Sequence, residues 1–462
     1  MNPRTTVADQ RALLDRGDAS AVDLVESCLR RIDEVQPELN CFVSVWAEEA
    51  LERARTIDVS RGGLAGIPIA IKDTSSWEGH LSTSGSITMR DNIARHTDAV
   101  VQSLLDAGAI IVASTNTPEF AHAGITDNRL WGVTRNPHDP TRTPGGSSGG
   151  SAVAVASGCV ALAEGSDMGG SVRIPAAWCG IVGLKPSLGR LPMTALPGLF
   201  DLLSHHGPLA RTVDDAWEFL LATQGPSLAD PYSVHAPLTH REPPIRGMKA
   251  AVSIDLGCWA VDSTIAAAVE NATNGLRSAG MVVENFDPRF TARDNALWLE
   301  LWGIFMAGYY GDVVDRHADQ MDPDVVWLIE LGRGFSAADA KRMEIERTSF
   351  WKRATAALHD HDVIICPTMS QPPGPADKET NRVRQQVHHD SLVHNEDMTS
   401  VWNLVSPCPV VSVPIGRHAS GDDVGLPIGI QIVGRPGADD VVLAVAQVIE
   451  RHTGAPSWRP NL

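Results

Sequence analysis

A chain of 462 residues with 43% hydrophobic and 20% charged residues, 40 glycines and 30 prolines has the composition of a loop-rich globular enzyme, not of a coiled coil or a disordered protein. Its formal charge of −18, with no cluster of lysine and arginine, argues against a nucleic-acid partner. The seven scattered cysteines and the absence of a long apolar run predict a reduced, cytoplasmic protein that does not contact membranes.

The predicted elements alternate between helices and strands, which is typical of an α/β fold. Two amphipathic helices are expected within residues 7–35, the second capped by Ser20, and the first buried strand ends directly before Lys72. The tracts 115–151 and 165–175 are rich in glycine and hydroxyl groups and are expected to be loops. In chain order, the remaining expected elements are helices at 46–58 and 98–107, a strand at 109–113, a helix at 152–158, strands at 160–163 and 181–185, a helix at 213–224, a strand at 250–254, a helix at 262–280, a strand at 281–285, a largely helical region from about 290 to 400 with a strand at 362–367, strands at 409–414 and 427–433, and a helix at 440–452.

Two blocks rich in glycine and serine, Gly145–Ser151 and Gly165–Ser171, carry the strongest chemical signal. A serine hydroxyl is a poor nucleophile until a neighbouring base removes its proton. Lys72 follows a buried apolar strand, where desolvation is expected to lower its pKa so that it can act as this base. The chain has only six lysines among its 38 lysines and arginines, so a lysine at this place is unusual.

The glycines of the second block predict a site that stabilises an oxyanion. Gly169 and Gly170 lack a Cβ atom, and this allows successive backbone N–H groups to converge on one point. The amides of Met168, Gly169, Gly170 and Ser171 are therefore expected to form the oxyanion hole.

Both blocks, their spacing and the upstream lysine resemble the amidase signature family. The resemblance implies that Ser171 attacks the acyl carbon, that Ser147, held by a cis peptide bond, relays the proton, and that Lys72 is the final proton acceptor. It also implies that Asp167 and Arg173 brace the loop rather than take part in the chemistry. Further matching segments are Thr83–Ser86, Thr115–Phe120, Thr134–Pro137, Gly207–Asp214, Ser412–Pro414 and Pro427–Gly434.

The fold implied by this resemblance is a single α/β/α sandwich domain with a large mixed, mostly parallel central sheet and a helical cap from the variable region. Within this domain, 1–462, we expect N-terminal helices at 1–60, a signature core at 61–225, a variable region that supplies the substrate pocket at 225–400, and C-terminal strands and a helix of the core at 401–462.

The function implied is hydrolysis of the C–N bond of a small carboxylic amide or anilide through an acyl-enzyme on Ser171, without metal or cofactor, by a monomer or homodimer. The same triad of Ser171, Ser147 and Lys72 would serve a carbamate (urethane) hydrolase or an esterase. The sequence does not choose among these substrates. A role as one component of an amidotransferase is disfavoured because the arginine-flanked middle region typical of that component is missing.

The pocket is harder to predict than the triad. Aromatic residues from Trp298 to Tyr310 recur at helical spacing, which fits a core face and a pocket wall equally well. Six residues are predicted to line the substrate pocket: Gly124, Thr126, Trp302, Met306, Tyr309 and Trp402.

Three other motifs have simpler interpretations. Gly145, Ser147 and Gly149 fit G-x-S-x-G, but the proline-rich segment before them cannot be the central strand that such an elbow requires. Ser349 and Lys352 fit S-x-x-K without its companion motifs. The histidines 359, 361, 388, 389 and 394 show no metal-binding spacing, and we interpret them as part of a solvated polar loop.

Overall fold

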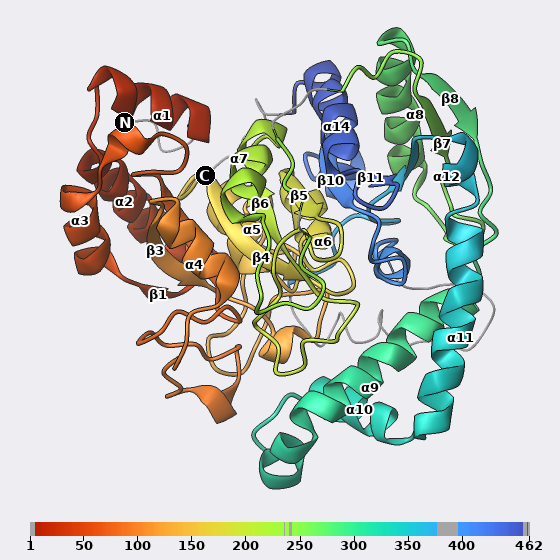
Figure 1. The fold of residues 1–462 in the computed structure, drawn as a ribbon, viewed down its shortest axis with the longest axis horizontal. Coiled ribbons are helices and arrows are strands. Elements are labelled where there is room, and N and C mark those ends of the chain that lie inside the picture. Colours follow the sequence, from red (N-terminus) through yellow and green to blue (C-terminus); the bar gives the residue numbers. More distant parts are fainter. Residues whose placement is uncertain (1–4, 235, 240–242, 377–395, 456–459, 461–462) are drawn as a thin grey trace.

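The fold is given by a computed structural model, which describes residues 5–234, 236–239, 243–376, 396–455 and 460 (Figure 1). Its centre is one sheet of 11 strands in the order β1-β3-β2-β4-β6-β5-β10-β11-β9-β7-β8. The strands are β1 (Phe42–Val45), β2 (Pro68–Lys72), β3 (Ile110–Thr115), β4 (Leu162–Asp167), β5 (Val182–Lys185), β6 (His205–Ala210), β7 (Lys249–Val252), β8 (Val282–Asn285), β9 (Val363–Pro367), β10 (Val410–Arg417) and β11 (Pro427–Gly434).

The sheet is mixed, as predicted, but the prediction that it is mostly parallel is wrong. Six of the strand pairings are antiparallel and four are parallel. Strand β6, which the sequence pattern did not reveal, lies between β4 and β5 and is antiparallel to both. Strands β10 and β11 follow each other closely in the chain and form an antiparallel pair, as a short connection requires.

Helices cover both faces of the sheet, which confirms the predicted α/β fold. The crossovers β2 to β3 and β3 to β4 run in opposite directions, so right-handed connections place α4 and α5 on opposite faces. Helices α4, α7, α14 and α8 contact one another in a row, and α5 contacts α6. The helices are α1 (Val7–Arg16), α2 (Ala21–Leu39), α3 (Ala47–Thr56), α4 (Ala99–Asp106), α5 (Gly149–Ala156), α6 (Arg173–Cys179), α7 (Val213–Thr223), α8 (Ser263–Ser278), α9 (Ala292–His317), α10 (Pro323–Arg333), α11 (Ala337–Ala354), α12 (Ala357–Asp360) and α14 (Asp439–Thr453).

Local sequence explains where several elements begin and end. Ser20 caps α2 as predicted. Its hydroxyl accepts a hydrogen bond from the Asp23 amide at 3.2 Å, and the Asp23 carboxylate accepts one from the Ser20 amide at 2.8 Å. Every residue of β2 is buried, as its run of apolar residues indicates.

In the parts of the chain that are described, no helix combines the length and the apolar character needed to cross a bilayer.

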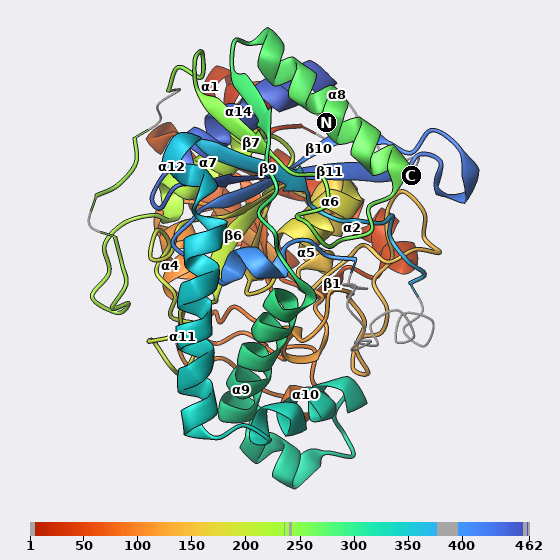
Figure 2. The same ribbon diagram turned by 90° about the vertical axis from the view of Figure 1, so that its right-hand side faces the viewer.

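The topology brings the two predicted loops to one edge of the sheet. Strand β2 is parallel to both of its neighbours, β3 and β4. The first loop, which begins at the end of β3, Lys72 at the end of β2 and Asp167 at the end of β4 therefore emerge at the same edge. Figures 1 and 2 both show α9, α10 and α11 grouped together below the sheet, well away from α8 and α14.

Candidate active site

Lys72 is a fully buried lysine that contacts two serine hydroxyls. Its Nζ lies 2.6 Å from Ser147 Oγ and 3.0 Å from Ser166 Oγ. Burial lowers the pKa of Lys72 to about 7, although the negative charges of Glu164 and Asp167 oppose this shift. Near neutral pH, therefore, a large fraction of Lys72 is an uncharged amine that can accept the proton of Ser147.

The first loop (115–151), which carries Ser147, and the second loop (165–175), which carries Ser171, meet at this lysine. The peptide bond between Gly146 and Ser147 is cis. The Ser148 amide donates to the carbonyl of Ser171 at 3.0 Å, and this bond joins the first loop to the second. Ser147 and Ser171 line the same cavity. The structure thus brings together the three residues that the sequence singled out for the proton relay.

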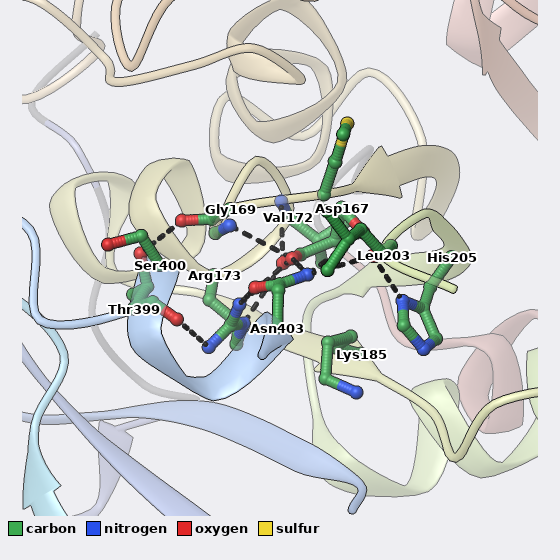
Figure 3. Close-up of polar contacts among 12 residues, drawn as sticks. Asp167, Gly169, Val172, Arg173, Lys185, Leu203, His205, Thr399, Ser400 and Asn403 are labelled. Carbon is green, nitrogen blue, oxygen red and sulfur yellow. Dashed lines mark hydrogen bonds and ion pairs between the residues drawn. The ribbon is translucent and has the colours of Figure 1, made fainter. Parts of the chain in front are cut away.

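The second loop is fixed by a buried ion pair between Asp167 and Arg173 (Figure 3). Arg173 donates from Nε to Asp167 Oδ2 and from one terminal nitrogen to Oδ1, both at 2.9 Å. The guanidinium also donates to Asn403 Oδ1 at 2.6 Å, to the Thr399 carbonyl at 3.1 Å and to Gln431 Oε1 at 3.2 Å. Asp167 and Arg173 therefore tie the loop to segments more than 200 residues further along the chain.

Positive charge around Asp167 keeps it ionised. Burial by itself would raise the pKa of Asp167, but the ion pair with Arg173, the Asn403 amide and the nearby Lys185 hold this pKa well below its usual range. Lys185 is itself fully buried, and its Nζ donates to the carbonyls of Pro186, Ser406 and Cys408 at 2.8–3.2 Å. Sequence reasoning did not select Lys185, although the scarcity of lysine that drew attention to Lys72 applies to it equally.

The amides of the second loop do not all have the predicted role. The Gly170 amide donates to Asp167 Oδ1 at 2.9 Å, so it supports the loop rather than facing a substrate. Gly170 has φ +121°, and a Cβ atom there would lie 1.9 Å from Thr399 Oγ1, which explains the need for glycine. Within the described chain, the amides of Met168, Gly169 and Ser171 enter no such hydrogen bond and stay candidates for the oxyanion hole.

A cavity of about 570 Å³ opens beside Ser147 and Ser171. Two of the predicted pocket residues, Gly124 and Trp302, line it. Its walls are rich in aromatic rings, and Phe120 and Tyr310 stack with their centroids 4.1 Å apart. The aromatic residues that line it are Phe120, Trp178, Trp298, Trp302, Phe305, Tyr310 and Trp327.

The other four predicted pocket residues lie elsewhere. Met306 and Trp402 are fully buried, Met306 among side chains of α9 and α10 and Trp402 against Phe290 at 5.5 Å. Tyr309 donates its hydroxyl to the Gly198 carbonyl at 3.1 Å, and Thr126 donates to the Gly145 carbonyl at 2.9 Å. Helical spacing identified α9 correctly, but it did not distinguish the side facing the cavity from the sides facing other helices.

The charged groups of the cavity are mainly acidic. Asp324, Glu396 and Asp397 are among its lining residues, and no lysine or arginine occurs among the lining residues that the structure describes. A substrate with a free carboxylate would find no cationic partner among them.

One group of described side chains has the geometry to hold a metal ion. Ligand atoms of His122, Asp322 and Asp324 all lie within 4.8 Å of one another. His122 Nδ1 bonds to the Glu119 carbonyl at 2.8 Å, and Asp322 caps α10. Because these contacts already give two of the residues structural tasks, we assign the group no part in the chemistry.

Among the described residues, the alternative motifs form no site of their own. Residues 116–144, all of them described, contain no strand, so the G-x-S-x-G match lacks the strand of a nucleophile elbow. Ser349 and Lys352 are exposed on α11. Of the histidines interpreted as a polar loop, His361 bonds to Glu284 at 2.8 Å, whereas histidines 388, 389 and 394 lie outside the described residues.

The pKa of Lys72 predicts the pH dependence of the reaction. A base must be uncharged, so kcat/KM should rise about tenfold per pH unit below pH 7 and level off above it. Measurement of kcat/KM from pH 5 to 9, in buffers of constant ionic strength, tests this. A profile that is flat between pH 5.5 and 7.5 would contradict the assignment of Lys72 as the base.

Comparisons with known proteins agree with this geometry. The family model described as Amidase matches residues 23–443. An acylamidase of Rhodococcus erythropolis is 32% identical to this chain, over 96% of it and 94% of the relative. A glutamyl-tRNA(Gln) amidotransferase component of Synechococcus sp. (strain WH7803) is 31% identical, over 98% of each chain.

A solved structure shows the same fold. The crystal structure of a bacterial aryl acylamidase of the amidase signature family has a TM-score of 0.90 and 27% identity, over 99% of both chains. The family match spans most of the sequence, the fold agrees over nearly its whole length, and the motif residues converge at one cavity. The chain therefore belongs to the amidase signature family, and its likeness to the Amidase model and to acylamidases supports a hydrolase that acts on carbon–nitrogen bonds other than peptide bonds.

Proposed function

We propose that this protein is an acylamidase that hydrolyses small uncharged amides or anilides with an aromatic or apolar part, through an acyl-enzyme on Ser171. The observation that carries the proposal is the 2.6 Å contact between Lys72 Nζ and Ser147 Oγ beside an aromatic cavity that Ser171 also lines. A buried lysine with its pKa lowered to about 7 is a suitable base for a serine relay.

In the proposed mechanism, uncharged Lys72 takes the proton of Ser147, and Ser147 takes the proton of Ser171 as Ser171 Oγ attacks the acyl carbon. The carbonyl oxygen of the substrate becomes an oxyanion, which the loop amides stabilise. Ser147 then gives a proton to the leaving nitrogen, replacing it from Lys72, and the C–N bond breaks to release the amine. Water attacks the acyl-enzyme by the same relay and releases the carboxylic acid.

The lining of the cavity supports this substrate class. Aromatic walls favour planar or apolar groups, and the described lining has no cation to bind a free carboxylate. For this reason we propose that the chain acts as a hydrolase in its own right, not as part of an amidotransferase, the activity for which several of its relatives are named. A carbamate or an ester would present the same electrophile to Ser171, so the relative rates decide among these substrates.

Labelling with a fluorophosphonate probe and peptide mapping tests the nucleophile. We expect a single adduct on Ser171, no adduct in the Ser171→Ala variant, and loss of hydrolysis in parallel. An adduct on another serine, with activity retained in Ser171→Ala, would overturn the proposal.

A matched substrate panel tests the specificity. Acetanilide, phenyl acetate, an O-phenyl carbamate and glutamine differ in the leaving group or in charge. We expect measurable kcat/KM for the anilide and none for glutamine. The opposite order would favour the amidotransferase function, and hydrolysis of the ester or carbamate without the anilide would favour those activities.

A further inference from the structure

We infer that Trp298 is a positioning residue of the oxyanion hole: by holding the carbonyl of Met168, its indole N–H directs the amide of Gly169 toward the reacting acyl group. This inference rests on the proposed function, because an oxyanion hole is needed only if Ser171 forms a tetrahedral adduct. Trp298 lies on α9, more than 120 residues along the chain from the loop that it would position.

The geometry of the peptide unit links the Met168 carbonyl to the Gly169 amide. In a trans peptide the carbonyl of one residue and the N–H of the next point in opposite directions. A hydrogen bond that fixes the carbonyl therefore also fixes the direction of the following amide. Trp298 Nε1 donates to the Met168 carbonyl at 3.0 Å, and this sets the direction of the Gly169 N–H.

The next peptide unit shows that the principle operates in this loop. Thr399 donates its hydroxyl to the Gly169 carbonyl at 2.7 Å, and the following amide, that of Gly170, points to Asp167 Oδ1 at 2.9 Å (Figure 3). Thr399 and Asp167 thus hold the two ends of one peptide unit. The unit before it is held at its carbonyl by Trp298, which leaves the Gly169 amide to bind an oxyanion.

The two remaining carbonyls of the loop are held by backbone donors. The Ile174 amide donates to the Gly170 carbonyl at 2.7 Å, and the Ser148 amide donates to the Ser171 carbonyl at 3.0 Å. All four carbonyls from Met168 to Ser171 therefore have a fixed direction. Only the first two depend on side chains, and both of these side chains come from segments distant in sequence.

Trp298 also packs directly against the loop. A Cβ atom on Gly169 would lie 2.1 Å from Trp298 Cζ2, so the indole ring occupies the space that any other residue would need there. The same ring lines the cavity and packs against Trp302 at 4.8 Å between centroids. One tryptophan therefore forms part of the substrate wall and orients an amide of the catalytic loop.

The Trp298→Phe variant tests this inference, because it keeps an aromatic ring and removes the N–H donor. We expect kcat to fall about tenfold with KM changed less than twofold. A misdirected amide stabilises the oxyanion of the transition state less well, and it changes the binding of the uncharged substrate little. Affinity for a boronic acid that forms a tetrahedral adduct with Ser171 should fall by the same factor. Affinity for a non-reactive competitive inhibitor, such as the product amine, should stay the same.

Trp259→Phe is the matched control. Trp259 also donates its indole N–H to a backbone carbonyl, that of Asp397 at 3.0 Å, but it does not line the cavity. We expect Trp259→Phe to keep the full kcat. Thr399→Val removes the hydrogen bond to the Gly169 carbonyl, and we expect it to lower kcat without a matching rise in KM.

The outcomes separate the inference from the proposed function. Wild-type kcat in Trp298→Phe, or an equal loss of affinity for the boronic acid and for the non-reactive inhibitor, would overturn the role of Trp298 alone. Failure of the fluorophosphonate to label Ser171 in the wild-type protein would overturn the proposed function. Circular dichroism and thermal melting establish that each variant is folded before its kinetics are interpreted.

Discussion

Replacement of Lys72 by methionine is expected to lower kcat/KM by about 10⁴-fold, comparable to the loss of a relay member in other serine hydrolases. Methionine fills a similar volume but cannot accept the proton of Ser147, which lies 2.6 Å from Nζ in the native protein. The remaining rate would come from substrate binding and the oxyanion hole. The rise in kcat/KM toward pH 7 should vanish in this variant.

The variant should fold normally. Burial makes the pKa of Lys72 lower in the folded chain than its ordinary value near 10.4, so the folded state disfavours the charged amine. Folding is therefore penalised below that ordinary pKa, most strongly below pH 7, and methionine removes the penalty. We expect a melting temperature at neutral pH no lower than that of the wild type. If the Lys72→Met protein is folded and its kcat/KM is within tenfold of the wild-type value, Lys72 is not the proton acceptor of the relay.

Lys185 provides a matched control for Lys72. It is also fully buried, and burial, together with the positive charge of Arg173, lowers its pKa to about 7, but its Nζ contacts backbone carbonyls instead of Ser147. In Lys185→Met these carbonyls lose their donor, so the main effect should be a lower free energy of unfolding. Comparison of the two variants separates the loss of a buried amine from the loss of the proposed base.

Replacement of Arg173 by methionine is expected to cause the largest loss of stability, about 3–5 kcal/mol in the free energy of unfolding. The change leaves the carboxylate of Asp167 buried without its ion pair, and it also removes the donors to Asn403, Thr399 and Gln431. Urea unfolding followed by tryptophan fluorescence measures this loss.

The pH dependence gives a second readout for Arg173→Met. Asp167 has a depressed pKa in the native protein, so its contribution to stability is present above pH 4 and is lost as the pH falls toward its folded pKa. In the variant the pKa of Asp167 should rise, and this acid-dependent part of the stability should shrink or reverse. As a control, Arg342→Met breaks an exposed ion pair with Asp339 and should leave the unfolding midpoint unchanged. Equal midpoints for both variants would contradict the importance of the buried pair.

Much of the site was predictable because short segments of sequence determine the local structure around its residues. Lys72 is the last residue of a buried strand, and the glycines around Ser147 and Ser171 mark loops in which backbone atoms approach one another closely. Parallel pairing of β2 with β3 and with β4 then brings these segments to one edge of the sheet. These features depend on short stretches of sequence and on a general rule of sheet geometry.

What could not be predicted depends on contacts between distant segments. The hydrogen bonds of Trp298 and Thr399 to the second loop cross 130 and 230 positions of sequence, and no local pattern reports them. Met306 and Trp302 share one helix and one aromatic stripe, yet Trp302 lines the cavity while Met306 faces α10. The number of parallel pairings was overestimated because strand direction depends on which strands become neighbours, and local sequence does not report this. Strand β6 accounts for two of the antiparallel pairings, and strands β1, β10 and β11 account for the other four.

The order of the strands has a consequence for synthesis of the protein on the ribosome. Strands β1 to β6 form one side of the sheet and β7 to β9 the other, and β10 and β11, the last strands to be made, lie between them. Until these two strands emerge, each side of the sheet has an uncovered edge and no strand joins the two sides. Thr399 and Asn403, which hold the second loop, are also made late. The nascent chain should therefore stay inactive, and in need of protection from aggregation, until β10 and β11 have been translated.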